Sequence, residues 1–306
     1  MSLIGNLGYT FYYKPKGWLK KIIKNGLFNS VSIEKGRKAM VKASALLKIT
    51  GPATDAAEVY FLTGKKFWPL TAFCMYSLSK QSGNKLRAVF VDDGSLDEAL
   101  IQTMRTQFPG CIIKTSAQIE ADIKTYLPAS KYPVINKKRA IYPHIKKLTD
   151  VHAGSTGWKL VLDSDMLFFK DPAEMVKWLD TPQEPFFLYD PIYSYHYSIK
   201  LMEQFAGNSI IPNLNVGAIG LKSELIDWDK LEIWIAQLEE KEGTNYLLEQ
   251  ALSAMLVAGD EPTIADKKEY IVKPEQSEVE HPLATLHHYV ADSKEWYYKK
   301  AWQQVI

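Results

Sequence analysis

The sequence predicts an α/β protein built on a doubly wound, mostly parallel sheet. Short apolar runs alternate with segments of helical periodicity from residue 57 onward. The run at residues 86–92 is almost continuously apolar, as expected for a parallel strand that is covered on both faces. With 306 residues, 46% of them hydrophobic, the chain is long enough for one large or two ordinary domains with a substantial core.

The first half of the chain alternates regularly. We expect strands at residues 57–63, 86–92, 111–114 and 158–162, and helices at residues 67–81, 96–107 and 137–151. The second half is less regular, with strands expected at 184–190 and 215–221, helices at 229–240 and 246–256, and a strand pair around 262–273. Sheets of this class bind ligands at the carboxyl ends of their strands, so we expect the functional residues at those ends.

Charge is distributed unevenly along the chain. The formal net charge is +2, but residues 1–50 contain ten basic residues and a single acidic one, Glu34. The apolar residues at helical spacing beside these lysines are Trp18, Leu19, Ile22, Ile23 and Leu27. We expect residues 1–55 to form a basic N-terminal extension. Its residues 14–48 are expected either to contact an anionic membrane surface peripherally or to include a helix docked by its apolar stripe.

The composition indicates where the protein is located and which partners it binds. No apolar run reaches the ~18 residues that span a bilayer, and the N-terminus lacks the order of a signal peptide. Cys74 and Cys111 fall in apolar stretches, where free thiols are expected. Basic residues are concentrated near the N-terminus, which argues against nucleic-acid binding. We therefore expect a cytoplasmic protein, with peripheral association at the inner membrane face through the extension.

The strongest chemical signal is a pair of aspartates at the end of a strand. Asp163 and Asp165 follow the apolar run at 160–162 and precede a second apolar run. Burying two carboxylates this close is costly, because like charges resist joint ionisation. A hard divalent cation such as Mn²⁺ or Mg²⁺ relieves that cost and takes oxygen ligands from carboxylates and substrate phosphates. The alternative is a turn with two solvated aspartates.

A second signal lies near the C-terminus, where His288 is followed six residues later by Lys294. An imidazole can complete the coordination sphere of Mn²⁺, and an ammonium group binds phosphate oxygens. The spacing therefore indicates a metal ligand next to a phosphate-binding cation.

Together these motifs resemble those of glycosyltransferase family 8, the retaining galactosyl- and glucosyltransferases that include the glycogenins. The family's Leu-Asp-x-Asp matches residues 162–165. Its His-x-x-Gly-x-x-Lys-Pro-Trp matches residues 288–296, with Ala291 and Glu295 in place of Gly and Pro. Its Asn-x-Gly-Val resembles residues 215–218, and its Asp-Gln-Asp resembles residues 249–251, where Ala251 replaces the third acid. The resemblance covers roughly residues 57–296.

The resemblance implies an A-type glycosyltransferase fold, with residues 56–306 as the nucleotide-sugar glycosyltransferase domain. It implies Mn²⁺ (or Mg²⁺) and a nucleotide-sugar donor, UDP-hexose by preference, with transfer to an acceptor hydroxyl and retention of configuration. The acceptor is expected to be a glycan or, because of the basic extension, a lipid-linked glycan or glycolipid. The implied metal ligands are Asp163, Asp165 and His288. The implied catalytic residues are Asn215, Glu249 and Gln250, and the sugar-binding residues are Asn215, Gly217 and Gln250. The candidate nucleotide-binding residues are Thr63, Asp93, Arg139, Asp163, Ser164 and Lys294.

Several alternatives stay open at this point. Asp93 belongs to an Asp-Gly-Ser sequence that is equally an ordinary turn. Glu249 is the candidate general base if transfer inverts configuration. The replacements at 251 and 291 are compatible with a catalytically weakened nucleotide-sugar or glycan-binding protein. A Mg²⁺-dependent phosphohydrolase with Asp163 as nucleophile is a further alternative.

Overall fold

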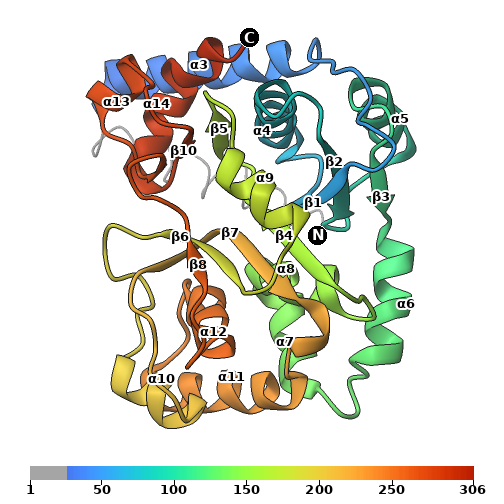
Figure 1. Cartoon of the computed structure of the whole chain (residues 1–306), viewed down its shortest axis with the longest axis vertical. Helices are drawn as coiled ribbons and strands as arrows, with labels where there is room; N and C mark the ends of the chain where they lie inside the picture. Colours follow the sequence, from blue (N-terminus) through green and yellow to red (C-terminus); the bar gives the residue numbers. More distant parts are fainter. Residues whose placement is uncertain (1–25) are drawn as a thin grey trace.

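The structure is a computed structural model that describes residues 26–306 (Figure 1). Residues 18–23 of the expected basic amphipathic helix lie outside the described residues. The first described helix, α3 (Leu27–Ser44), packs along α14 (Lys294–Lys299). A Cβ at Gly36 would lie 2.1 Å from the carbonyl oxygen of Tyr298, so the two backbones are in direct contact. Residues 27–44 are thereby joined to the C-terminal part of the body.

A seven-stranded sheet forms the centre of the described chain, in the order β3-β2-β1-β4-β7-β6-β8. Its strands are β1 (Ala57–Thr63), β2 (Leu86–Asp92), β3 (Ile112–Lys114), β4 (Trp158–Leu162), β6 (Phe186–Tyr189), β7 (Leu214–Lys222) and β8 (Thr263–Ile264). Among them β7 pairs antiparallel with both β4 and β6, and the other pairings are parallel. The predicted doubly wound, mostly parallel sheet is confirmed.

Helices cover both faces of this sheet (Figure 1). They are α4 (Trp68–Gln81), α5 (Glu98–Gln107), α6 (Ser116–Tyr126), α7 (Pro133–Ile141), α8 (Lys146–His152), α9 (Ala173–Asp180), α10 (Ile199–Ala206), α11 (Trp228–Glu242), α12 (Leu248–Leu256) and α13 (Gln276–Glu280), besides α3 and α14. Successive side chains of a strand point to opposite faces. Phe61 and Phe90 therefore enter the core with α4, while Tyr60 and Val89 enter a second core with α8 and α12.

The predicted helix at residues 137–151 is wrong as a single element. The chain forms α7, a short 3₁₀ turn from Pro143 to Ile145, and then α8. Tyr142 has ψ 89°, outside the helical region, because the ring of a following proline disfavours that region. The break turns the start of α8, with Lys146 and Lys147, toward the sheet edge.

A small second sheet was not predicted. It contains β5 (Met166–Phe168), β9 (Tyr270–Val272) and β10 (Leu286–His288) in the order β5-β10-β9. Two strands do lie in the expected segment 262–273, but they do not pair with each other: β8 joins the large sheet beside β6, while β9 pairs with β10. The three-residue strands β5 and β10 were missed because so short a run carries little alternation.

The two cysteines are free thiols, Cys74 buried and Cys111 partly buried. Among the described residues, no helix combines the length and apolarity needed to cross a membrane.

Candidate functional site

The two aspartates lie where the large sheet meets the small one. Asp163 comes directly after β4, and its N–H donates to the carbonyl oxygen of Gly217 on β7 at 2.7 Å. Asp165 precedes β5, and its carbonyl oxygen accepts from the N–H of Tyr289 at 2.9 Å. Because β5 pairs antiparallel with β10, His288 stands opposite Met166. Two segments that are more than 120 residues apart in the sequence thus meet at one sheet edge.

The three expected metal ligands form one cluster. Ligand atoms of Asp163, Asp165 and His288 all lie within 4.8 Å of one another. His288 Nε2 is 3.2 Å from an oxygen of Asp165 and 3.6 Å from an oxygen of Asp163. Two carboxylates and one imidazole are hard and borderline donors that suit Mn²⁺, and carboxylates suit Mg²⁺.

The hydrogen bonds of Asn215 orient the imidazole of His288 and determine the role of its Nδ1 atom. Asn215 Oδ1 accepts from the N–H of Gly217 at 2.9 Å and lies 3.2 Å from His288 Nδ1. Its Nδ2 donates elsewhere, so Oδ1 is the acceptor and His288 Nδ1 carries the proton. Nε2 is then the ring nitrogen that faces the carboxylates, and its lone pair can bind a metal ion that displaces any proton there; this buried atom has no hydrogen-bond partner among residues 26–306. Such an orphaned imidazole nitrogen, oriented by a second residue, fits a metal ligand.

Gly217 makes this arrangement sterically possible. A Cβ at this position would lie 2.3 Å from Cε1 and 2.4 Å from Nδ1 of His288, and 2.6 Å from Cε of Met166. Any larger residue would push the imidazole away from the aspartates. The glycine expected to bind sugar therefore has a structural role toward His288, the expected metal ligand.

A buried lysine that the sequence analysis missed lies between two acids. Lys147 Nζ is 3.1 Å from Asp163 and 3.4 Å from Glu249, and it donates to the carbonyl oxygen of Val216 at 2.9 Å. Burial disfavours an ammonium, but these two carboxylates outweigh it and raise the pKa of Lys147 above its ordinary value. Burial also raises the pKa of Glu249 to about 7. One oxygen of Glu249 has no hydrogen-bond partner in the described part of the chain. A run of basic residues just before the metal motif was the available signal for Lys147.

Asp190 is a second residue that the sequence analysis missed, at the end of β6. Its Oδ2 accepts from Gln250 Nε2 at 3.2 Å and from Asn215 Nδ2 at 3.1 Å. Ala251, where the family has its third acid, is fully buried in the apolar core against β7. A carboxylate is therefore present beside Gln250, but it comes from another strand. The position of Asp190 at the end of the strand expected at 184–190 was the sequence signal that could have identified it as a site residue.

Lys294 completes the charged cluster, with Nζ 2.8 Å from Asp165 Oδ2. Burial favours the neutral acid, but His288 and Lys294 hold the pKa of Asp165 below its usual range. Ala291, which replaces the family's glycine, has φ 49°. The backbone here thus keeps a left-handed conformation that glycine adopts at lower cost.

The other expected nucleotide-binding residues divide into two groups. The hydroxyl groups of Thr63, Thr71 and Ser164 form a chain with spacings of 2.7 Å, which links the end of β1 to the aspartate motif. Asp93 follows β2 at the same edge, and its N–H donates to the carbonyl oxygen of Thr63 at 2.8 Å. Arg139 is not brought to the cluster. Its contacts are ion pairs with Asp150 at 2.6 Å and Glu120 at 2.7 Å, which join α6, α7 and α8.

A groove of about 880 Å³ lies next to the cluster. It begins at Tyr189 and Pro191, on either side of Asp190, and reaches Ser293 and Glu295, on either side of Lys294. Tyr189 and Trp296 are the aromatic residues of its wall, and each ring also has a lysine ammonium over it, Lys267 at 4.8 Å and Lys299 at 4.6 Å from the ring centroid. Aromatic faces of this kind can pack against sugar rings.

Comparison with known proteins gave structural matches only: no family model matches the chain, and no curated protein matches its sequence. The fold is similar to that of mouse xyloside xylosyltransferase 1 (12% identity, 77% of this chain and 98% of that chain, TM-score 0.50). It is also similar to the galactosyltransferase LgtC in complex with donor and acceptor sugar analogs (13% identity, 81% and 95%, TM-score 0.50). The bifunctional glycosyltransferase WbbM matches with 11% identity over 84% of this chain and 50% of its own, TM-score 0.51. The chain has the A-type glycosyltransferase fold that the resemblance implied.

Proposed function

We propose that the protein is a metal-dependent glycosyltransferase that moves a sugar from a nucleoside diphosphate, UDP by preference, to a hydroxyl of a glycan or glycolipid. The observation that carries the proposal is the Asp163–Asp165–His288 cluster at the carboxyl edge of the sheet. The solved structures with this fold that are named above are glycosyltransferases, and one contains donor and acceptor sugar analogs. That likeness supports the class of reaction.

In this proposal each charged residue has a distinct role. Mn²⁺ or Mg²⁺, when bound by Asp163, Asp165 and His288, supplies positive charge where the diphosphate leaving group develops negative charge. Lys294, with its ammonium beside Asp165 and half exposed, donates to the phosphate oxygens. Thr63, Asp93 and Ser164 line the nucleotide side at the ends of β1, β2 and β4.

The transferred sugar lies in this proposal between β7 and α12. Asn215, Gln250 and Asp190 form a hydrogen-bonded set there, and its carboxylate and amide groups can bind sugar hydroxyls. Glu249 beside Lys147 is the remaining catalytic candidate, and retention of configuration is part of the proposal through the resemblance. The groove bordered by Tyr189 and Trp296 is the proposed acceptor site.

Thermal unfolding with UDP and with GDP, each in Mn²⁺ and in EDTA, tests the donor site. A nucleotide at about 100 times its Kd stabilises the folded state by about 2.7 kcal/mol, which raises Tm by several degrees. We expect a shift with UDP that disappears in EDTA and in Asp165→Asn. Asp180→Asn, an exposed aspartate at the end of α9, is the matched control and keeps the shift. A nucleotide shift that persists in EDTA would contradict the proposed metal–diphosphate site.

Transfer itself is tested by incubating UDP-hexoses with Mn²⁺ and following release of UDP. Release of UDP by the wild type that is abolished in Asp165→Asn would support glycosyltransferase activity. Nucleotide binding without turnover of any donor would instead indicate a nucleotide-sugar-binding protein without transferase activity.

A further inference from the structure

The helix α3 presents a basic face away from the body of the protein. Gly36 and Met40 point inward, and Asn29 on the same side donates to Glu295 of α14 at 2.8 Å. Residues three and four positions apart share one face of a helix. The opposite face therefore contains Lys35, Lys38 and Lys42, all exposed. Since α3 is packed against α14, the direction of this face is fixed by the fold.

Among the described residues, no ion pair neutralises the lysines of this basic face. The acid of α3, Glu34, pairs with Arg37, whose guanidinium donates to it at 2.7 and 3.0 Å. Lys35, Lys38 and Lys42 have no ion pair with a described residue. The preceding residues 1–25 add five lysines and no acid to the same part of the sequence. The matching partner is therefore anionic.

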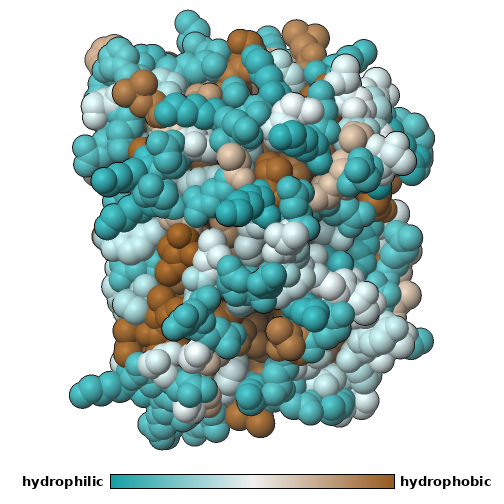
Figure 2. Space-filling model, viewed as in Figure 1, coloured by the Kyte–Doolittle hydropathy of each residue, from teal (hydrophilic) through white to brown (hydrophobic). Residues whose placement is uncertain are grey.

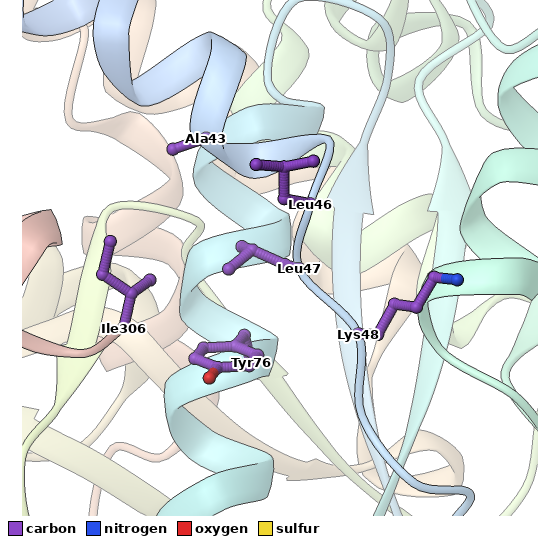
Figure 3. Close-up of a pocket in the computed structure, with 6 residues that line it drawn as sticks. All are labelled: Ala43, Leu46, Leu47, Lys48, Tyr76 and Ile306. Atoms are coloured by element: carbon purple, nitrogen blue, oxygen red, sulfur yellow. The ribbon is translucent and has the colours of Figure 1, made fainter.

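Exposed apolar side chains flank the lysines at both ends of α3. Phe28 is 91% exposed near its start, and Leu46 is 82% exposed just after its end. A hollow of about 270 Å³ opens beside Leu46, between Leu47, Tyr76 and Ile306 (Figure 3). The surface view has apolar residues among hydrophilic ones along the edge where α3 lies (Figure 2). Side chains that insert below headgroups, next to lysines whose amines stay at the phosphates, are typical of helices lying in a membrane interface.

We infer that the α3 face, defined by Lys35, Lys38, Lys42, Phe28 and Leu46, docks the protein on an anionic phospholipid bilayer. A helix of 18 residues is about 27 Å long, so it presents an extended line of these side chains to a surface. Glu295, the partner of Asn29, also lines the groove beside the metal cluster. Docking would bring that groove close to the headgroups. Its use for a lipid-linked acceptor rests on the proposed function, whereas the docking itself does not.

Co-sedimentation of the full chain with phosphatidylcholine vesicles, with and without phosphatidylglycerol, tests the docking. Each lysine near an anionic surface contributes about 1 kcal/mol, or about five-fold in the partition coefficient. We expect the triple substitution Lys35→Gln, Lys38→Gln and Lys42→Gln to weaken binding to the anionic vesicles on the order of 100-fold at low salt. Thermal unfolding should be unchanged, because these lysines are exposed and form no ion pair with a described residue.

The matched control removes three exposed lysines at the opposite end of the molecule, on α7, α10 and α11 (Figure 1). These substitutions are Lys137→Gln, Lys200→Gln and Lys241→Gln. The control has the same net charge and should keep vesicle binding within about two-fold if location rather than total charge matters. Equal losses in both triple variants, or no loss in either, would overturn the inference.

The apolar part of the face is tested separately with Phe28→Ser and Leu46→Ser. Loss of vesicle binding supports insertion. If these changes instead alter the mass measured by sedimentation velocity and leave vesicle binding intact, the face joins two copies of the chain and the inference is wrong. None of these variants should change metal or nucleotide binding, so the docking proposal and the proposed function can fail independently.

Discussion

Replacing Gly217 by alanine should separate metal binding from folding at this site. The new Cβ would lie 2.3–2.4 Å from the imidazole of His288 and 2.6 Å from Met166. The imidazole must therefore move, and with it the Nε2 atom that faces the two aspartates. Overpacking of this kind costs about 1–3 kcal/mol of folding stability. Displacing an oriented histidine ligand costs about 10–100-fold in metal affinity.

The chain supplies a matched control on the same strand. A Cβ at Gly220 would lie 2.6 Å from the ring of Trp178 and 2.7 Å from Cβ of Phe186, in the apolar core. Gly220→Ala should therefore lose a comparable 1–3 kcal/mol, but it should bind metal as the wild type does. The comparison distinguishes a local effect on His288 from a general loosening of β7.

The assay is a titration with Mn²⁺ followed by the electron paramagnetic resonance signal of the free ion, alongside urea unfolding. Gly217→Ala should weaken Mn²⁺ binding by at least about 10-fold relative to Gly220→Ala. Equal Mn²⁺ affinity in the two variants would refute the assignment of His288 as a ligand that requires Gly217.

Four further outcomes follow from single residues. Lys147→Met removes the cation beside Asp163 and should lower the free energy of unfolding in urea by about 3 kcal/mol without metal. Mn²⁺ should restore part of that stability. An equal loss of stability with and without Mn²⁺ would argue against a cation site there. Burial lowers the pKa of His152 to about 3, so the unfolded state takes up a proton first as the pH falls below 6.5 and stability is lost between pH 6.5 and 3. His152→Gln should therefore reduce the slope of unfolding free energy against pH in this window by up to about 1.4 kcal/mol per pH unit, whereas parallel slopes would assign the acid sensitivity elsewhere. Ala291→Gly should be neutral or stabilising by up to about 1 kcal/mol in urea unfolding, because its φ is positive; a destabilisation would mean that the alanine methyl group contributes packing. Arg139→Lys should lower Tm because it weakens the ion pairs with Asp150 and Glu120, but it should leave UDP binding unchanged. Weaker UDP binding in calorimetry would show that Arg139 is a nucleotide-binding residue after all.

The local pattern of the sequence was sufficient for the frame of the fold. Strands β1, β2 and β4 begin and end at the predicted residues, because a buried parallel strand is a continuous apolar run with polar residues at its end. For the same reason Asp163 was expected at a strand end. The pairing of residues 163 and 165 with His288 required the resemblance, since no local rule relates two segments so far apart in the chain.

The tertiary structure alone determined how the site is completed. Lys147 is an ordinary lysine in the sequence, and it becomes a buried partner of two acids only because the break at Pro143 starts α8 beside the sheet edge. Asp190 brings a carboxylate to Gln250 from the end of β6, which no pattern in α12 could indicate. Arg139 matched by sequence order, yet its guanidinium is held by Asp150. Strand order and helix placement depend on packing between distant segments, and the periodicity of a single segment contains no information about that packing.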